Sequence, residues 1–330
     1  MTWRRAIGKL EAATYHFCVK HLRQSEREPV IMPMITPIDA TFGARITDIK
    51  LGALSDAEWT TVEAAFNEYG ALVFPEQHLT DEEHIAFCER FGPIELLRGD
   101  GEKAARISNK RAGGGVMTPE EKRFQALRGN EGWHTDSSYM PLAAKASALA
   151  AEITPPSGGE TELADMRAAY DALDDAMRTR IADLAAYHSL YQSQAKAGFT
   201  FKTGDGYGYH TEGAPLRPLV KTHPATGRKS LFIGRHAFRI PGMEDAEALE
   251  LLDGLLEFAC QEPRTYAHSW TPGDLMIWDN RCILHRACPY DYNEPRVMRH
   301  VRVAGDPATE TAPTGRDDRA DAFQPSAATA

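Results

Sequence analysis

Two histidines and one aspartate have the residue types and the spacing of a metal site. His134 and Asp136 are two positions apart, and His285 lies far downstream. Side chains alternate along an extended segment, so His134 and Asp136 face the same side, and a strand adjacent in space has to supply His285. Two imidazoles and one carboxylate on one face of an ion form the facial triad of non-heme iron(II) oxygenases, which keeps other positions open for a co-substrate and O₂.

An arginine and a threonine near these residues predict where the co-substrate is held. A His-x-Asp pair alone arises by chance in many proteins, but here Arg296 follows His285 within a strand-like run. Its planar guanidinium matches a carboxylate fork, as the distal carboxylate of 2-oxoglutarate requires. Thr161 could donate a hydroxyl to the same carboxylate. These residues, in this order, predict iron(II) and 2-oxoglutarate as the cofactors.

The motifs around these residues resemble those of the TauD/TfdA family, whose members are iron(II)- and 2-oxoglutarate-dependent dioxygenases. The resemblance covers most of the chain, from about Ile35 to about Pro307. It is carried by short stretches along that length: GALVF at 70–74, FCERFG at 87–92, WHTD at 133–136, PPSGGET at 155–161, ADM at 164–166, THP at 222–224, WDNRCILH at 278–285 and the run from 296 to 306.

The resemblance implies a role for each of the residues singled out above. Three residues would bind iron and carry catalysis, namely His134, Asp136 and His285. Two more, Thr161 and Arg296, would anchor 2-oxoglutarate. Asn130 matches a polar residue that lines the substrate side of the site.

Within the family the chain is most similar to the aryloxyalkanoate dioxygenases that cleave chiral phenoxypropionate herbicides. The stretches that carry this similarity are Asn130 to Pro141, MRAAYDAL at 166–173 and IGRHAFRIPGM at 233–243. It implies hydroxylation of the carbon that bears the ether oxygen of a small anionic substrate, with release of succinate and CO₂. Hydroxylation of an alkylsulfonate, as in taurine, or of another carboxylate is the alternative within the family.

Four residues are predicted to contact this substrate: Asn130, Tyr139, His300 and Arg302. Taurine-type members carry a second arginine four positions after the 2-oxoglutarate arginine, where this chain has His300, and this argues against taurine itself. Along an extended strand His300 and Arg302 share a face with the anchoring arginine, whereas Arg299 points away. Arg98 and Arg235 are further candidate partners of an anion. Each of these cations could instead be a solvated surface charge.

Two other classes of protein fit part of the pattern. A zinc hydrolase could use two histidines and an aspartate, but no His-Glu-x-x-His arrangement supplies a general base. A non-catalytic jelly-roll binding or sensor protein would have a vestigial iron site, yet all three ligands and both anchors are present. Cys282 and Cys288 flank His285, and as thiolates they would favour zinc or iron–sulfur chemistry.

The composition narrows the choice of partners. The chain has 37 basic and 47 acidic residues and a net charge of −10, which argues against nucleic acid. Its 5 cysteines are an odd number without paired spacing, which favours a reduced, cytoplasmic setting over a disulfide framework. No apolar run approaches the roughly 18 residues of a membrane span. We expect a cytoplasmic homo-oligomer whose partners are a small anionic substrate and O₂, with no membrane.

Short strands between Gly- and Pro-containing turns, without βαβ alternation, predict a mainly β fold with peripheral helices and a double-stranded β-helix (jelly-roll) core. The expected strands are 71–74, 146–153, 217–221, 230–234, 264–270, 274–278 and 297–304. Helices are expected after the capping boxes that begin at Ser55 and Thr80. Further helices are expected from Thr118-Pro119-Glu120-Glu121 and over about 166–184 and 245–260.

Residues 32–307 are predicted to form one dioxygenase-like domain between two dissimilar ends. Residues 1–31 are interpreted as an N-terminal extension from an upstream start codon, because the resemblance begins just after Met32 and Met34. Residues 308–330 have almost nothing to bury and are expected to be a disordered tail. The segment Gly99–Gly129 is either a lid that excludes water or a mobile surface excursion without a gating role.

Overall fold

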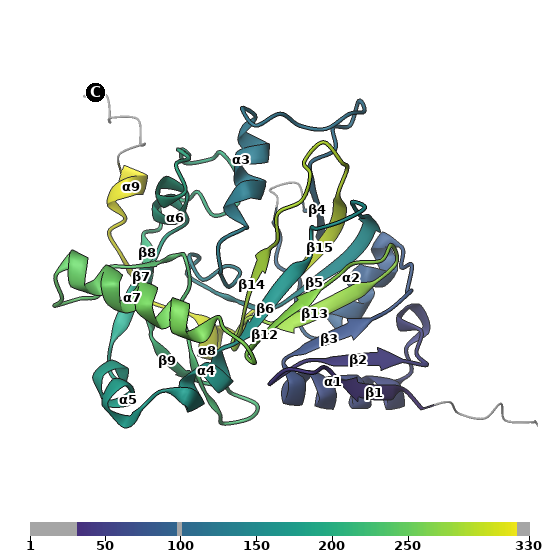
Figure 1. The fold of residues 1–330 in the computed structure, drawn as a ribbon, viewed down its shortest axis with the longest axis horizontal. Coiled ribbons are helices and arrows are strands. Elements are labelled where there is room, and N and C mark those ends of the chain that lie inside the picture. Colours follow the sequence, from purple (N-terminus) through teal and green to yellow (C-terminus); the bar gives the residue numbers. More distant parts are fainter. Residues whose placement is uncertain (1–31, 98–100, 322–330) are drawn as a thin grey trace, which may run out of the picture. The chain divides into compact units, whose positions relative to one another are not determined.

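The structure is a computed structural model, and it describes residues 32–97 and 101–321 (Figure 1). The chain divides into two units, Met1–Ile31 and Met32–Ala330. The first unit lies outside the described residues, and with it the predicted N-terminal extension at 1–31. All helices and strands named below belong to the second unit.

A seven-stranded sheet is the largest sheet of the described residues, in the order β1-β2-β3-β13-β5-β15-β4. Neighbouring strands are antiparallel except for the parallel pair β2 and β3. The short apolar strand β3 is buried along its whole length. The strands are β1 (Met34–Pro37), β2 (Ala44–Thr47), β3 (Ala71–Phe74), β4 (Ala104–Ser108), β5 (Ala144–Ile153), β13 (Leu275–Asp279) and β15 (Val297–Ala304).

A three-stranded antiparallel sheet packs against the inner face of this large sheet. Its order is β12 (Thr265–His268), β6 (Thr161–Asp165) and β14 (Ile283–Ala287). Apolar side chains of both sheets share one buried cluster, which includes Leu149, Trp278 and Met298 from the large sheet and Leu163 and Ile283 from the small one. The predicted mainly β fold with peripheral helices is confirmed.

The outer face of the large sheet is covered by two helices that begin as predicted. Helices α1 (Asp56–Tyr69) and α2 (Asp81–Glu89) each start with a complete capping box, at Ser55 and Thr80. Each box satisfies backbone N–H groups that have no partner within the first turn. Their apolar side chains and those of β3 form a second buried cluster, so β3 is sandwiched between helices and the small sheet (Figure 1).

Two of the helices differ from the predictions. The helix expected from Thr118 begins only at Lys122, as α3 (Lys122–Gly129). The four residues before it form a turn instead, which is closed by a hydrogen bond of 3.1 Å from the Glu121 N–H to the Thr118 carbonyl oxygen. The helix expected over 166–184 is interrupted, giving α4 (Met166–Ala172) and α5 (Asp175–Ile181). The interruption arises because the Asp174 side chain caps α5. Helix α7 (Asp245–Ala259) confirms the last predicted helix.

The remaining elements surround a third buried apolar cluster, which α4 and α7 share with the strands beside them. The strand expected over 217–221 is in fact two, β8 and β9, in different sheets. The four-stranded sheet is β11 (Ala237–Phe238), β7 (Ala185–His188), β8 (Ala214–Pro218) and β16 (Thr314–Gly315), and the two-stranded sheet is β10 (Lys229–Leu231) with β9 (Val220–Thr222). The chain also forms two short helices before residue 200, η1 (Leu51–Ala53) and α6 (Leu190–Lys196).

The expected disordered tail is wrong for residues 308–321. They contribute helix α8 (Pro307–Glu310), strand β16 and helix α9 (Asp318–Asp321). Glu310 is buried and pairs with Lys221, and Arg217 donates to the Glu310 carbonyl oxygen at 3.0 Å. Hydrogen bonds and an ion pair hold this segment against the rest of the chain. Its low content of large apolar residues therefore did not predict that it is folded. Residues 322–330 lie outside the described residues.

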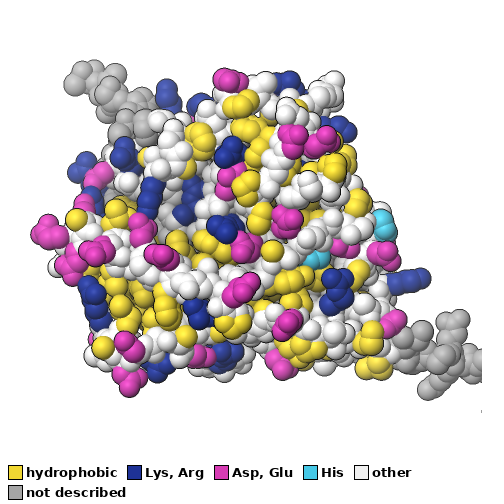
Figure 2. Space-filling model, in the orientation of Figure 1, with side chains coloured by type: hydrophobic (Ala, Val, Ile, Leu, Met, Phe, Trp, Pro, Cys, Tyr) yellow, Lys and Arg dark blue, Asp and Glu magenta, His cyan; other side chains and the backbone are white. Residues whose placement is uncertain are grey.

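Charged side chains are spread over the visible surface. Figure 2 shows Lys and Arg interspersed with Asp and Glu on the face it presents. Among the described residues, no helix combines the length and the apolar character that crossing a membrane requires.

Candidate active site

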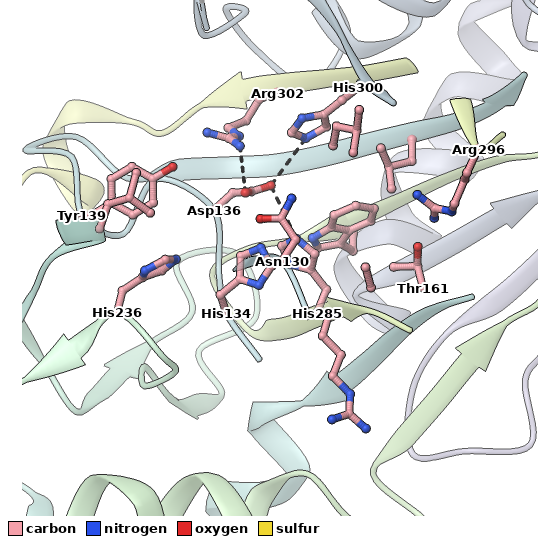
Figure 3. A pocket seen from close by; sticks show the side chains of 16 residues that line it. Asn130, His134, Asp136, Tyr139, Thr161, His236, His285, Arg296, His300 and Arg302 are labelled. Carbon is pink, nitrogen blue, oxygen red and sulfur yellow. Dashed lines mark hydrogen bonds and ion pairs between the residues drawn. The ribbon is translucent and has the colours of Figure 1, made fainter. Parts of the chain in front are cut away.

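Three buried side chains point toward one another in one pocket: His134, Asp136 and His285 (Figure 3). Residues of the seven-stranded and the three-stranded sheets line this pocket. One potential ligand atom of each lies within 4.8 Å of the others. His134 stands in the loop between α3 and β5, and its backbone pairs with that of His285 on β14 through N–H···O bonds of 2.9 and 2.8 Å. The two motifs that are far apart in sequence therefore meet here.

Each histidine turns one nitrogen toward the shared centre. His134 donates from Nδ1 to the Gly132 carbonyl oxygen at 2.8 Å, which leaves its Nε2 lone pair free. Nε2 of His285 lies 3.7 Å from Oδ2 of Asp136. Burial lowers the pKa of His134 to about 4 and holds the pKa of His285 well below its usual value. Both imidazoles are therefore neutral at pH 7, as metal binding requires.

Asp136 is a buried carboxylate that stays ionised. Burial opposes its charge, but the Arg302 guanidinium holds its pKa well below the usual range. Arg302 donates from Nη2 to Oδ1 at 2.8 Å, and the Ser147 hydroxyl donates to Oδ2 at 2.5 Å. Nε2 of His300 lies 3.5 Å from the same Oδ2. The carboxylate is thus both charged and fixed in orientation.

These donors fit a divalent transition metal. Two neutral imidazole nitrogens and one carboxylate oxygen converge from one side, which is the donor set of a facial triad. The Gly132 carbonyl and the Ser147 hydroxyl supply the supporting hydrogen bonds that ligands of this kind need.

Arg296 is a buried cation that has no carboxylate partner among the described residues. Its Nε donates to the Gly159 carbonyl oxygen at 3.0 Å, and burial lowers its pKa. Gly159 has a φ of +74°, and a Cβ there would lie 3.2 Å from the Arg296 side chain, so the close approach requires glycine. An unpaired buried charge is costly, and this arginine is therefore suited to an anionic ligand.

Thr161 lies beside Arg296 and lines the same pocket (Figure 3). Its Oγ1 accepts a hydrogen bond of 3.1 Å from Nε1 of Trp270. The hydroxyl proton of Thr161 is therefore directed elsewhere and is available to an anion held by Arg296.

The pocket that contains these groups has a volume of about 630 Å³, part of which is open to solvent. It combines a polar wall with an apolar one, as small-molecule sites commonly do. Its lining residues are Ile107, Asn130, His134, Asp136, Tyr139, Leu149, Thr161, Leu190, His236, Trp278, His285, Arg286, Ala287, Arg296, His300 and Arg302.

The sequence of the chain matches a known family over most of its length. The model described as "Taurine catabolism dioxygenase TauD, TfdA family" matches residues 34–303. The chain belongs to the TauD/TfdA family. It is therefore a dioxygenase that uses iron(II), 2-oxoglutarate and O₂ to oxidise a small molecule.

Several TauD/TfdA proteins are similar to this chain. An (S)-phenoxypropionate/alpha-ketoglutarate-dioxygenase of Sphingobium herbicidovorans is 54% identical, over 84% of this chain and 97% of that protein. An alpha-ketoglutarate-dependent 2,4-dichlorophenoxyacetate dioxygenase of Cupriavidus pinatubonensis is 38% identical, over 82% of this chain and 97% of that protein. The crystal structure of AAD-2 in complex with Mn(II) and N-oxalylglycine has a TM-score of 0.76 and 38% identity, over 87% of this chain and 100% of that one.

The four predicted substrate residues all line the pocket, but two of them contact Asp136. Arg302 is buried and donates to the Asp136 carboxylate, so the idea of a solvated surface charge is wrong for it. His300 also lies against this carboxylate. Arg299 points away from the pocket, as predicted, and binds Asp81 and His84. The substrate roles of the four residues stay predictions.

The sequence did not single out several residues of the pocket. Among them are the apolar side chains Ile107, Leu149 and Leu190. The loop residue His236, to which the sequence assigns no definite role, also lines the pocket, and its ring centre lies 5.6 Å from that of His134. His236 falls inside the stretch 233–243 that carries the closer resemblance, and this was the available signal. Arg235 does not line the pocket and donates to the Ser193 carbonyl oxygen at 2.8 Å. Arg98 lies outside the described residues.

A second group of potential metal ligands, His223, Asp279 and Cys282, is occupied by other contacts. Asp279 binds Arg281 through both oxygens, at 2.8 and 2.5 Å, and His223 lies 2.9 Å from it. Burial raises the pKa of Cys282 well above its usual value, so its thiol stays protonated. This cluster does not fit the thiolate metal site that Cys282 and Cys288 could have indicated.

The segment Gly99–Gly129 is partly built into the fold. Within it, β4 is an edge strand of the large sheet, and α3 ends directly before Asn130, which lines the pocket. Between them, Gly113, Gly114 and Gly115 lie in an exposed turn that Lys110 and Val116 close. A gating role for this turn stays a prediction, as does the alternative of a surface excursion.

Substitution of the triad should remove metal binding without unfolding the chain. His134→Ala or His285→Ala removes a ligand lone pair, so one-to-one iron(II) binding and turnover should both be lost. Asp136→Ala should keep weak binding through the two imidazoles and lose nearly all turnover. Isothermal titration with circular dichroism checks this, and the exposed His78→Ala variant serves as the control. Wild-type affinity in either histidine variant would refute the triad.

Removal of the Arg296 side chain should affect the co-substrate far more than the substrate. Loss of one partner of a buried charged pair costs about 3–5 kcal/mol, which is roughly two to three and a half orders of magnitude in affinity. Arg296→Ala should therefore raise the apparent KM for 2-oxoglutarate by about that factor. The Arg299→Ala variant, whose guanidinium lies outside the pocket, is the matched control. An unchanged KM for 2-oxoglutarate in Arg296→Ala would assign the anchor to another residue.

Proposed function

We propose that this dioxygenase hydroxylates the carbon that bears the ether oxygen of a 2-aryloxypropionate or a similarly shaped carboxylate. The hemiketal then collapses to a phenol and a keto acid, and 2-oxoglutarate leaves as succinate and CO₂. The observation that carries the proposal is Arg296, a buried cation without a carboxylate partner among the described residues, in the same pocket as the triad. Relatives at 54% and 50% identity named for (S)-phenoxypropionate support the substrate class.

The residues of the site have separate tasks in this reaction. His134, Asp136 and His285 hold the iron, and Arg296 with Thr161 holds the distal carboxylate of 2-oxoglutarate. When bound, iron(II) and 2-oxoglutarate supply the activation of O₂ and the hydroxylation of a C–H bond. The protein orients these partners and limits the access of water, since most of the residues that line the pocket are buried.

The substrate side of the pocket suits an aromatic carboxylate. The apolar side chains of Leu149, Leu190 and Ile107 line the pocket and offer contacts to a ring. Asn130 and Tyr139 offer polar groups, and we propose them as contacts of the substrate. Arg302 places positive charge in the same pocket and His300 adds an imidazole ring, and we include them although both also lie against Asp136.

We further propose that the seven- and three-stranded sheets are the two halves of a double-stranded β-helix (jelly-roll), as their shared apolar cluster supports. A cytoplasmic location is proposed because Cys88, Cys260, Cys282 and Cys288 are free thiols. The homo-oligomer stays a prediction from the sequence.

The two hands of a phenoxypropionate should differ as substrates. A rigid pocket that places one C–H bond toward the iron should favour one enantiomer by about ten-fold or more. Each enantiomer is supplied separately, and phenol and succinate are followed together, with 2-oxoglutarate alone as the control. Succinate formed with an alkylsulfonate, but no phenol from either hand, would contradict the aryloxyalkanoate substrate and favour the sulfonate alternative.

A further inference from the structure

Three segments that are far apart in the sequence meet beside Asp136. Glu95 follows α2, Arg302 belongs to β15, and Tyr207 stands between α6 and β8 in residues 197–213, here named the Tyr207 loop. Arg302 binds the Asp136 carboxylate and also donates to the hydroxyl of Ser137 at 2.8 Å. Its Nε lies 3.7 Å from Oε2 of Glu95.

The Glu95 carboxylate joins these segments. It accepts a hydrogen bond of 2.9 Å from the Ser137 hydroxyl and another from the Tyr207 hydroxyl. The ring of Tyr207 lies 5.5 Å from the Arg302 guanidinium, in a cation–π contact. Glu95 thus connects the Tyr207 loop with Arg302, which binds the Asp136 carboxylate, and with Ser137, the next residue along the chain.

Ser137 shows why this connection matters for the metal site. It directly follows Asp136, is buried, and has a φ of +54°. This left-handed conformation is unfavourable for residues other than glycine, so the surroundings have to maintain it. The hydroxyl contacts with Glu95 and Arg302 do so. Glu95 therefore supports the direction of the chain at Asp136, together with the backbone bond of 2.9 Å from Met140 to the Ser137 carbonyl oxygen.

The Tyr207 loop also contacts the wall of the pocket. Gly208, next to Tyr207, has a φ of +87°, and a Cβ there would lie 2.4 Å from the ring of Tyr139. Tyr139 lines the pocket on the substrate side. The same loop therefore touches the substrate wall and the support of a metal ligand.

We propose that Tyr207 is a positioning residue of the metal site, which acts through Glu95 on Arg302 and Ser137 and so fixes the Asp136 carboxylate. The inference rests on the proposed iron ligands. It goes beyond them because it links a loop on the substrate side to the strength and geometry of metal binding.

The test removes one hydroxyl from the loop at a time. Tyr207→Phe keeps the ring over Arg302 and loses the bond to Glu95 together with the 3.3 Å contact between the Tyr207 and Ser137 hydroxyls. The matched control is Tyr191→Phe, because the Tyr191 hydroxyl also binds the Tyr207 loop, at Thr203 (3.0 Å) and the His210 carbonyl (3.2 Å), without touching Glu95. The measurement is the titration of Co(II) into the metal-free protein, followed by visible absorption.

The expected result separates the two variants. Loss of a supporting contact to a metal ligand typically weakens metal affinity by about 10- to 100-fold. The Co(II) affinity of Tyr207→Phe should be weaker than that of the wild type by a factor near the lower end of this range. Tyr191→Phe should bind Co(II) as wild type does. Glu95→Gln, which removes the charge and keeps the size, should weaken binding in the same direction. In the iron-loaded enzyme, Tyr207→Phe should form more succinate per hydroxylated product, with the KM for 2-oxoglutarate unchanged.

Two results would overturn the inference. Wild-type Co(II) affinity in Tyr207→Phe, or an equal loss in Tyr191→Phe, would show that the contact with Glu95 does not position the ligand. A wild-type protein that binds no Co(II) would overturn the triad itself, and this failure is recognised before any variant is compared.

Discussion

The charge of the Asp136 carboxylate, held away from water between two sheets, governs the arrangement of the side chains around it. Removing a carboxylate from water costs several kcal/mol unless charged and polar donors replace its hydration. Arg302 and Ser147 provide these donors, one to each oxygen. The carboxylate that we propose as a metal ligand is thereby ionised and oriented without a metal.

The register of the large sheet is what brings these donors together. Arg302 of β15 and Ser147 of β5 are direct partners across the two strands, so both side chains project from the same face toward Asp136. A slip of one residue would turn each of them to the opposite face, where helix α2 covers β15 and Arg299 binds Asp81. The buried apolar residues Val301 and Val303, on that opposite face, hold the register. Packing in the core thus determines the chemistry of the pocket.

The sequence predicted the features that depend on local pattern. The triad and its anchors could be proposed because their types and order are characteristic. Helices α1 and α2 could be predicted because capping boxes are local. The roles of Arg302 and Glu95 could not be found, since their partners come from three separate segments. The tail was misjudged for a similar reason, because a buried pair between Glu310 and Lys221 leaves no trace in composition.

The central claim is that the triad and Arg296 form one site for iron(II) and 2-oxoglutarate. Anaerobic titration of iron(II) into the protein with 2-oxoglutarate tests it most directly. The account predicts a weak visible charge-transfer band that requires both additions and saturates at one iron per chain, followed by succinate when air is admitted. No band at any iron concentration, together with no succinate in air, would contradict the account.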